Sequence, residues 1–95
     1  MKLKEMPEEW KPEIIIDLLK VVKLYYTNYT HINNKFIINL NKNINEDELD
    51  IIIMSNMFTS INNIIKKYNK NPMHYKRFFK TEFEYNKDNT LTIEY

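Results

Sequence analysis

The chain contains no glycine in its 95 residues, and this absence constrains its turns and its chemistry more than any other feature. Glycine adopts positive φ angles at low steric cost and lets the backbone approach a phosphate closely. A Walker loop, a dinucleotide-binding fingerprint, a nucleophile elbow and an EF-hand loop all need it. Cysteine is absent too, which excludes a thiolate nucleophile and a thiolate zinc site. The sequence therefore predicts no enzyme, no cofactor and no metal.

The size and charge of the chain favour a single small domain. Because a chain of 95 residues cannot divide its apolar residues between two cores, we expect one domain over residues 1–95, with residues 1–11 as a candidate N-terminal arm. The net charge is +1. A histone-like binder or an acidic nucleic-acid mimic relies on a strong field of one sign, and this near-balance argues against both.

The N-terminal residues and the composition predict where the protein acts. No apolar secretory region and no membrane-spanning run is found, so we expect a cytoplasmic protein. Isoleucine and asparagine dominate the composition. Both are favoured by A/T-rich codons, which hints at a virus or mobile element; the host cytoplasm would then be the location.

The first predicted helix covers residues 12–27. Pro12 suits the first helical position, and Glu13 and Asp17 lie near the positive end of the helix dipole. Helical spacing gives one broad apolar face of Ile14, Ile15, Leu18, Leu19, Val21, Val22, Tyr25 and Tyr26. We expect this face to pack on the core.

The second predicted helix begins after Asn45, a natural N-cap that forms a capping-box-like pattern with Glu48. Asn69 or Asn71 is expected to end it in the left-handed conformation. Ile52 is predicted to project from the polar side. The predicted core face comprises Ile53, Met54, Met57, Phe58, Ile61, Ile64, Ile65 and Tyr68.

Each helix is followed by sequence typical of a β-hairpin. Residues 28–32 and 35–40 flank Asn33-Asn34, a pair that can supply the two positive φ angles of a type I′ turn. The second hairpin turns at residues 86–89, and its apolar face comprises Phe79, Thr81, Phe83, Tyr85, Leu91, Ile93 and Tyr95.

The element order therefore predicts an α+β fold of the form αββαββ. We expect both helices to pack on one face of a mostly antiparallel sheet of three or four strands. If residues 25–31 remain helical, the order becomes αβαββ.

Residues 66–80 are rich in basic and aromatic side chains. Such a mix can neutralise phosphates while bases stack on exposed rings, which makes nucleic-acid binding the alternative function. The competing interpretation is that the cations favour the C-terminus of the second helix and that most of the rings belong to the core. The candidate nucleic-acid contacts are Lys66, Lys67, Lys70, Lys76, Arg77 and Lys80, with Tyr68, Tyr75, Phe78 and Phe79 between them.

The carboxylates of residues 46–50 form the densest acidic cluster. Three of them lie in the first helical turn, where the dipole alone favours them. Asp50 falls within the apolar stripe, so we expect it to be solvated at the helix end or to accept a hydrogen bond from a tyrosine hydroxyl or a backbone amide. A hydrolase using this cluster would need metal-dependent turnover, and we expect none. His31 and His74 are expected in turns or loops as ordinary surface residues.

The chain has more apolar side chains than the core of a two-layer domain needs, which favours function through surface contacts. The predicted interface residues are Trp10, Ile52, Tyr75, Arg77 and Phe78. Trp10 could instead close one end of the core. The sequence thus predicts a small binding protein that contacts another protein, in one hypothesis a host protein that it inhibits. Self-association as a homodimer is expected through a sheet edge or the first helix.

Overall fold

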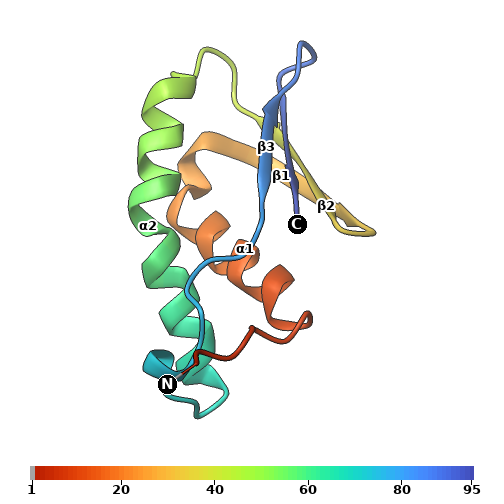
Figure 1. The fold of residues 1–95 in the computed structure, drawn as a ribbon. Helices are drawn as coiled ribbons and strands as arrows, with labels where there is room; N and C mark the ends of the chain where they lie inside the picture. The colour runs from red at the N-terminus through yellow and green to blue at the C-terminus, as the bar shows by residue number, and fades with distance from the viewer. Residues whose placement is uncertain (1) are drawn as a thin grey trace.

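The computed structural model describes residues 2–95, which form two helices and a four-stranded sheet in one α+β domain (Figure 1). The elements follow in the order α1 (Trp10–Val21), β1 (Tyr26–Ile32), β2 (Lys35–Leu40), α2 (Glu46–Lys67), β3 (Glu82–Tyr85) and β4 (Thr90–Glu94). The short 3-10 turn η1 (Lys23–Tyr25) precedes β1, and η2 (Pro72–His74) follows α2. The predicted fold class and the αββαββ order are confirmed.

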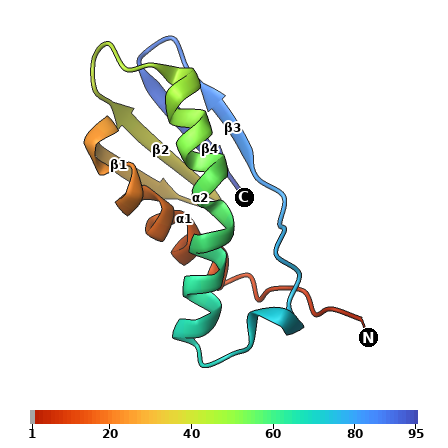
Figure 2. The same ribbon diagram turned by 90° about the vertical axis from the view of Figure 1, so that its left-hand side faces the viewer.

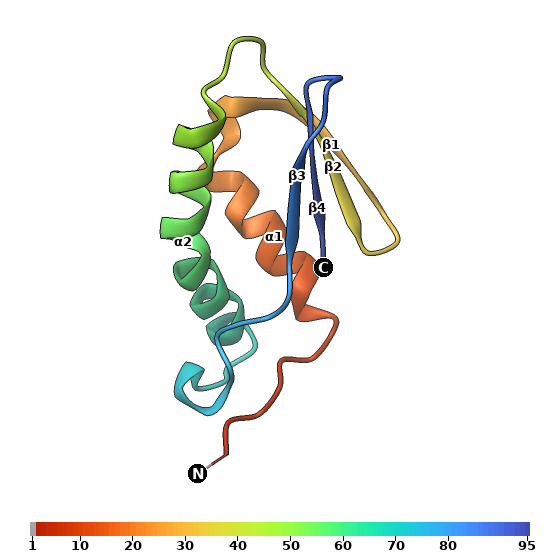
Figure 3. The ribbon, with the colours of Figure 1, turned by 45° about the horizontal axis from the view of Figure 1, so that its top comes forward.

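The strands of the sheet lie in the order β1-β2-β4-β3, and every pairing is antiparallel. The pairing of β2 with β4 joins the two hairpins and places Phe36 opposite Ile93. Both helices lie on the same face of the sheet (Figures 2 and 3). No helix within residues 2–95 covers the opposite face, so the described part of the chain forms two layers.

Helix α1 differs from the predicted helix at both ends. It begins at Trp10 and ends at Val21, whereas residues 12–27 were expected. Pro12 is accommodated because it lies in the first turn, where backbone N–H groups have no helical partner. After η1 the chain is extended from Tyr26 onward, since its aromatic and β-branched side chains favour a strand. The αβαββ alternative is therefore wrong.

Asparagine takes the left-handed backbone positions in this glycine-free chain. Among residues 2–95, Asn33, Asn43, Asn69 and Asn89 have positive φ angles, all between 54° and 64°. Asparagine tolerates this conformation better than most residues because its short polar side chain can form local hydrogen bonds. Asn34 does not share the positive φ of Asn33, so the prediction of a type I′ turn is wrong.

Both ends of α2 are capped as the sequence predicts. The side chain of Asn45 accepts a hydrogen bond from a backbone N–H of the first turn at 3.1 Å. At the other end the Asn69 N–H donates to the Lys66 carbonyl and the Lys70 N–H to the Ile65 carbonyl. This pair of bonds around a left-handed residue is a Schellman motif, which satisfies carbonyls that the helix leaves open.

The core lies between the helices and the inner face of the sheet. Phe79 belongs to it although β3 begins only at Glu82, so the second hairpin is shorter at its start than predicted. The largest fully buried side chains are Phe36, Ile14, Ile15, Leu18, Leu19, Ile38, Leu49, Ile53, Ile61, Ile65, Leu91 and Ile93.

The chain before α1 lies against the chain that follows α2. The Lys4 N–H donates to the His74 carbonyl at 2.9 Å, and the Lys76 N–H donates to the Lys4 carbonyl at 2.8 Å. Met6 is buried in the core. Of the candidate arm over residues 1–11, Met1 lies outside the described residues, the segment from Lys4 to Met6 is docked on the domain, and the last two residues belong to α1.

Candidate protein-binding surface

Trp10 and Tyr75, two of the predicted interface residues, lie largely inside the domain. Trp10 is only 4% exposed, and its ring lies 5.0 Å from the half-buried ring of Tyr75. Trp10 therefore offers a partner almost no surface, as the interpretation of a core residue predicts.

The core-facing side of α2 is rotated relative to the predicted one. Ser60 is buried, and Ile52 packs half-buried against the core. By contrast, Met54 and Phe58 are 54% and 59% exposed, and Ile51 is 69% exposed. The predictions that Met54 and Phe58 are buried and that Ile52 faces solvent are wrong. Sequence reasoning missed the row of Ile51, Met54 and Phe58 as an exposed surface.

The exposed row continues onto the chain that leads to β3. Phe78 is 79% exposed, and a groove of about 270 Å³ lies between it and α2. Figure 2 shows this segment of the chain running beside α2. We call Ile51, Met54, Phe58 and Phe78 the apolar strip. The groove is lined by Met54, Met57, Phe58, Ile61, Arg77, Phe78, Phe79 and Thr81.

Shallow hollows extend the strip at both ends. The N-terminal hollow, about 490 Å³, is lined by Asp50, Ile51, Met54 and Ser55 of α2. The other hollow is lined by Leu3, Pro72, Met73, Tyr75 and Arg77. Met54 and Arg77 each line both the groove and one hollow. The three depressions thus adjoin one another at these two side chains, between the start of α2 and η2.

Half of the candidate nucleic-acid contacts already pair with carboxylates of the same chain. Lys67 pairs with Glu13 at 2.8 Å, Lys76 with Glu5 at 2.6 Å and Lys80 with Glu82 at 3.5 Å. Within residues 2–95 the cations of this set without an ion pair are Lys66, Lys70 and Arg77.

The rings of the same segment are mostly engaged as well. Tyr68 stacks on Trp10 and Phe79 lies in the core, so Phe78 is the ring most exposed to a partner. A basic-aromatic nucleic-acid surface needs free rings beside free cations. Phe78 and Arg77 meet this condition, because both line the same groove.

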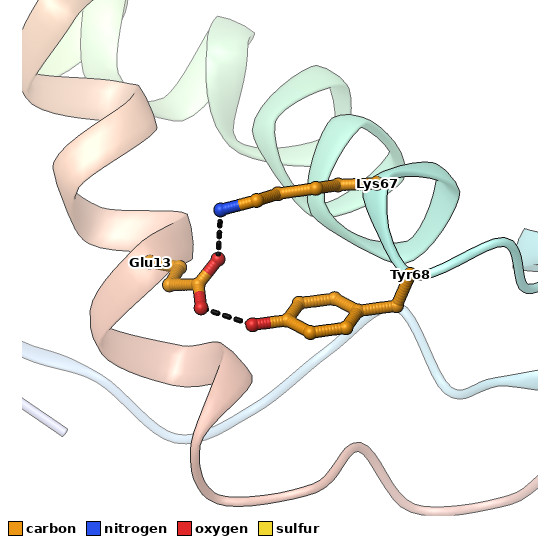
Figure 4. Close-up of polar contacts among 3 residues, drawn as sticks. All are labelled: Glu13, Lys67 and Tyr68. Carbon is orange, nitrogen blue, oxygen red and sulfur yellow. Dashed lines mark hydrogen bonds and ion pairs between the residues drawn. The ribbon is translucent and has the colours of Figure 1, made fainter.

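Glu13 links the two helices electrostatically (Figure 4). It accepts hydrogen bonds from the Lys67 ammonium and from the Tyr68 hydroxyl. These bonds favour the charged carboxylate, so the pKa of Glu13 lies below its usual value. The same contact raises the pKa of Lys67 and of Tyr68. This cluster is a structural clamp between α1 and the end of α2.

The acidic cluster at the start of α2 is also tied to its surroundings. The Tyr85 hydroxyl donates to Asp50 at 2.6 Å, which confirms the predicted tyrosine partner. Burial and this carboxylate raise the pKa of Tyr85. The Tyr25 hydroxyl donates to Glu48 at 2.9 Å. Among residues 2–95, no group of three His, Cys, Asp or Glu side chains is placed to hold a metal ion.

The two histidines lie in different settings. His31 is a residue of β1, not of a turn as predicted; its ring stacks on Phe36 and hydrogen-bonds the Tyr95 hydroxyl. His74 is exposed in η2. Neither residue contributes to the apolar strip.

Comparison with known proteins gives no functional assignment. The chain matches no protein-family model, no curated protein and no solved structure. None of the helices over residues 2–95 is both long and apolar enough to cross a bilayer. Function is therefore inferred from the surfaces and contacts of this chain alone.

Proposed function

We propose that the protein is a non-catalytic binding protein that acts through protein–protein contacts centred on the apolar strip. The observation that carries the proposal is the exposure of the four strip side chains, each by more than half, along one side of α2. Large contiguous apolar patches mark interaction sites. Aromatic residues and methionine are enriched at the centres of protein interfaces.

The contacts of residues 66–80 support this proposal over nucleic-acid binding. Binding driven by phosphates gains affinity from each cation that it neutralises. Lys67, Lys76 and Lys80 are already paired within the chain, so fewer cations remain for a polyanion. Apolar contact area, in contrast, is available without breaking any ion pair.

The test is affinity capture with chemical cross-linking from cells that produce the protein, with and without nuclease. Wild type is compared with Phe78→Asp, which places a charge on the most exposed side chain of the strip. Leu24→Asp is the matched control, because Leu24 is 90% exposed but lies in η1, outside the strip. We expect a nuclease-resistant protein contact that Phe78→Asp abolishes and Leu24→Asp preserves.

The salt dependence of capture distinguishes a protein interface from nucleic-acid binding. An apolar interface should tolerate moderate salt, whereas phosphate contacts weaken steeply as salt rises. Capture that disappears with nuclease and with Arg77→Glu, while Phe78→Asp leaves it intact, would overturn the proposal in favour of nucleic-acid binding.

A further inference from the structure

We infer that the partner of the apolar strip is a second copy of the same chain, lying antiparallel along α2 about a two-fold axis. This inference rests on the proposed function and names the partner of that same surface. A two-fold interface is self-complementary: the patch of each copy must carry both a feature and the feature that it fits.

The strip carries such a pair of shapes. Phe78 projects at one end of it, and the N-terminal hollow, lined by Asp50, Ile51, Met54 and Ser55, lies at the other. The groove places Phe78 beside the part of α2 from Met54 to Ile61. An axis near the middle of the strip therefore brings Phe78 of each copy to the N-terminal hollow of the other. This contact forms twice and covers Ile51, the most exposed residue of the α2 row.

The charges along α2 are complementary in the same orientation. The helix begins with Glu46, Asp47 and Glu48 and ends with Lys66, which has no ion pair within residues 2–95, and Lys67, whose ammonium also pairs with Glu13. Two antiparallel copies place the acidic end of one beside the basic end of the other. The opposed helix dipoles favour the same arrangement. A parallel arrangement would place like charges together and is disfavoured.

Arg77 gives this complementarity a specific pair. It lines the groove beside Phe78 and has no ion pair within residues 2–95. When Phe78 enters the N-terminal hollow of the other copy, Arg77 comes to the acidic start of that helix. Asp47 lies there, exposed and also without an ion pair within residues 2–95. We therefore assign the charged contact of the interface to Arg77 and Asp47.

The sheet edges are less suited to a second copy. The β1 edge is interrupted by a register shift between Tyr26 and Asn28, and such bulges protect edge strands from pairing. The β3 edge is four residues long and carries Glu82 and Glu84, whose charges have the same protective effect.

The oligomeric state is measured by sedimentation velocity and light scattering over a range of concentrations. Wild type should shift to twice the 11.7 kDa mass of one chain as concentration rises. Phe78→Asp should weaken the dimer by at least about tenfold, as expected for a buried aromatic anchor. Leu24→Asp should leave it unchanged. Circular dichroism checks that the variants remain folded.

Charge reversal tests the geometry directly. Arg77→Glu alone should weaken the dimer, because it places Glu opposite Asp47 twice, and Asp47→Arg alone should do so by placing Arg opposite Arg77. Mixing the two variants should restore association, since both contacts of the mixed dimer then pair opposite charges. Failure of the mixture to associate better than either variant would overturn the inferred orientation.

The outcomes separate this inference from the proposed function. A specific dimer should form at a chain concentration of about 0.1 mM. A wild-type chain that stays monomeric at this concentration overturns the inference of a dimer. If Phe78→Asp then still abolishes capture of a different protein, the proposed function stands. A dimer that no strip substitution weakens has its interface elsewhere and overturns the inference; capture that is equally insensitive overturns the proposed function.

Discussion

Trp10 stacks on Tyr68 with 5.2 Å between the ring centroids and 18° between the ring planes. Trp10 begins α1, and Tyr68 directly follows α2, so the stack joins the start of one helix to the end of the other. The Tyr68 hydroxyl also donates to Glu13 in the first turns of α1. The single tryptophan therefore fixes how the two helices meet, and this role explains its burial.

Replacing Trp10 with alanine should destabilise the fold strongly. Truncating a buried aromatic side chain typically costs about 3–5 kcal/mol, from lost burial and the cavity that remains. Urea unfolding followed by circular dichroism measures the loss, since the variant has no tryptophan fluorescence. Leu24→Ala is the control: Leu24 is 90% exposed and lies outside the apolar strip, so the change should stay within about 0.5 kcal/mol. The opposite ranking of the two variants would show that Trp10 is not a core residue.

The clamp at Glu13 predicts how stability depends on acidity. Hydrogen bonds from Lys67 and Tyr68 hold the pKa of Glu13 below its usual 4.5 in the folded state. Because the unfolded chain binds this proton more tightly, the contribution of Glu13 is complete above pH 4.5 and is lost as pH falls through the folded-state pKa. The stability gap between wild type and Glu13→Gln should therefore shrink below that pH.

Urea unfolding of both proteins from neutral to acidic pH measures this gap. Glu84→Gln, on the exposed side of β3, controls for the general effect of removing a carboxylate. A gap between wild type and Glu13→Gln that does not change with pH would contradict the clamp.

Local signals in the sequence predicted the helix caps well and the two hairpins in outline. The Asn45 cap and the left-handed Asn69 are set by residues within a turn of the helix end, so neighbours in the sequence suffice to specify them. The end of α1 was harder to predict, because Tyr25 and Tyr26 fit either an apolar helix face or a strand. Pairing of β1 with β2 decides between them.

The rotation of α2 could not be predicted from periodicity. An apolar arc shows which side chains are able to pack, but α1 and the sheet decide which part of the arc they cover. Ser60 is buried because it lies in the middle of the covered part, whereas Met54 and Phe58 lie at its uncovered border. The width of the arc was the available signal that some of these residues face solvent.

Of the five predicted interface residues, two are exposed side chains of the same groove. Arg77 and Phe78 line the groove as exposed neighbours, and a loop sequence is enough to suggest this. Which side chains of α2 lie beside these two residues depends on packing between elements that are distant in the chain.

Asn69 and Asn89 should respond differently to substitution, although both have positive φ angles. Alanine at position 69 should cost about 1–2 kcal/mol, because its Cβ is strained in the left-handed conformation, while glycine should fit without this cost. At position 89 even glycine should destabilise, since the Asn89 amide donates to the Leu40 and Asn41 carbonyls. Each lost hydrogen bond is worth about 1 kcal/mol. Thermal unfolding of Asn69→Gly and Asn89→Gly decides this; equal stabilities would contradict the distinction.

Tyr85 should stabilise the fold through its hydrogen bond to Asp50, and alkaline pH should remove that effect. The hydroxyl donates to the Asp50 carboxylate at 2.6 Å in a partly buried site, and Tyr85→Phe should therefore cost about 1–2 kcal/mol at neutral pH. Burial and the neighbouring carboxylate raise the pKa of Tyr85 above its usual 10.0. A raised pKa means that the contribution is complete below pH 10.0 and is lost as pH rises through the folded-state value.

Urea unfolding at neutral and strongly alkaline pH should therefore show the stabilities of wild type and Tyr85→Phe converging at the higher pH. Tyr25→Phe is the matched control, because the Tyr25 hydroxyl makes a comparable bond to Glu48 at an exposed site, where water can replace it. Its effect at neutral pH should be clearly smaller. If both phenylalanine variants lost the same stability, burial of the Asp50–Tyr85 pair would not be the source of its strength.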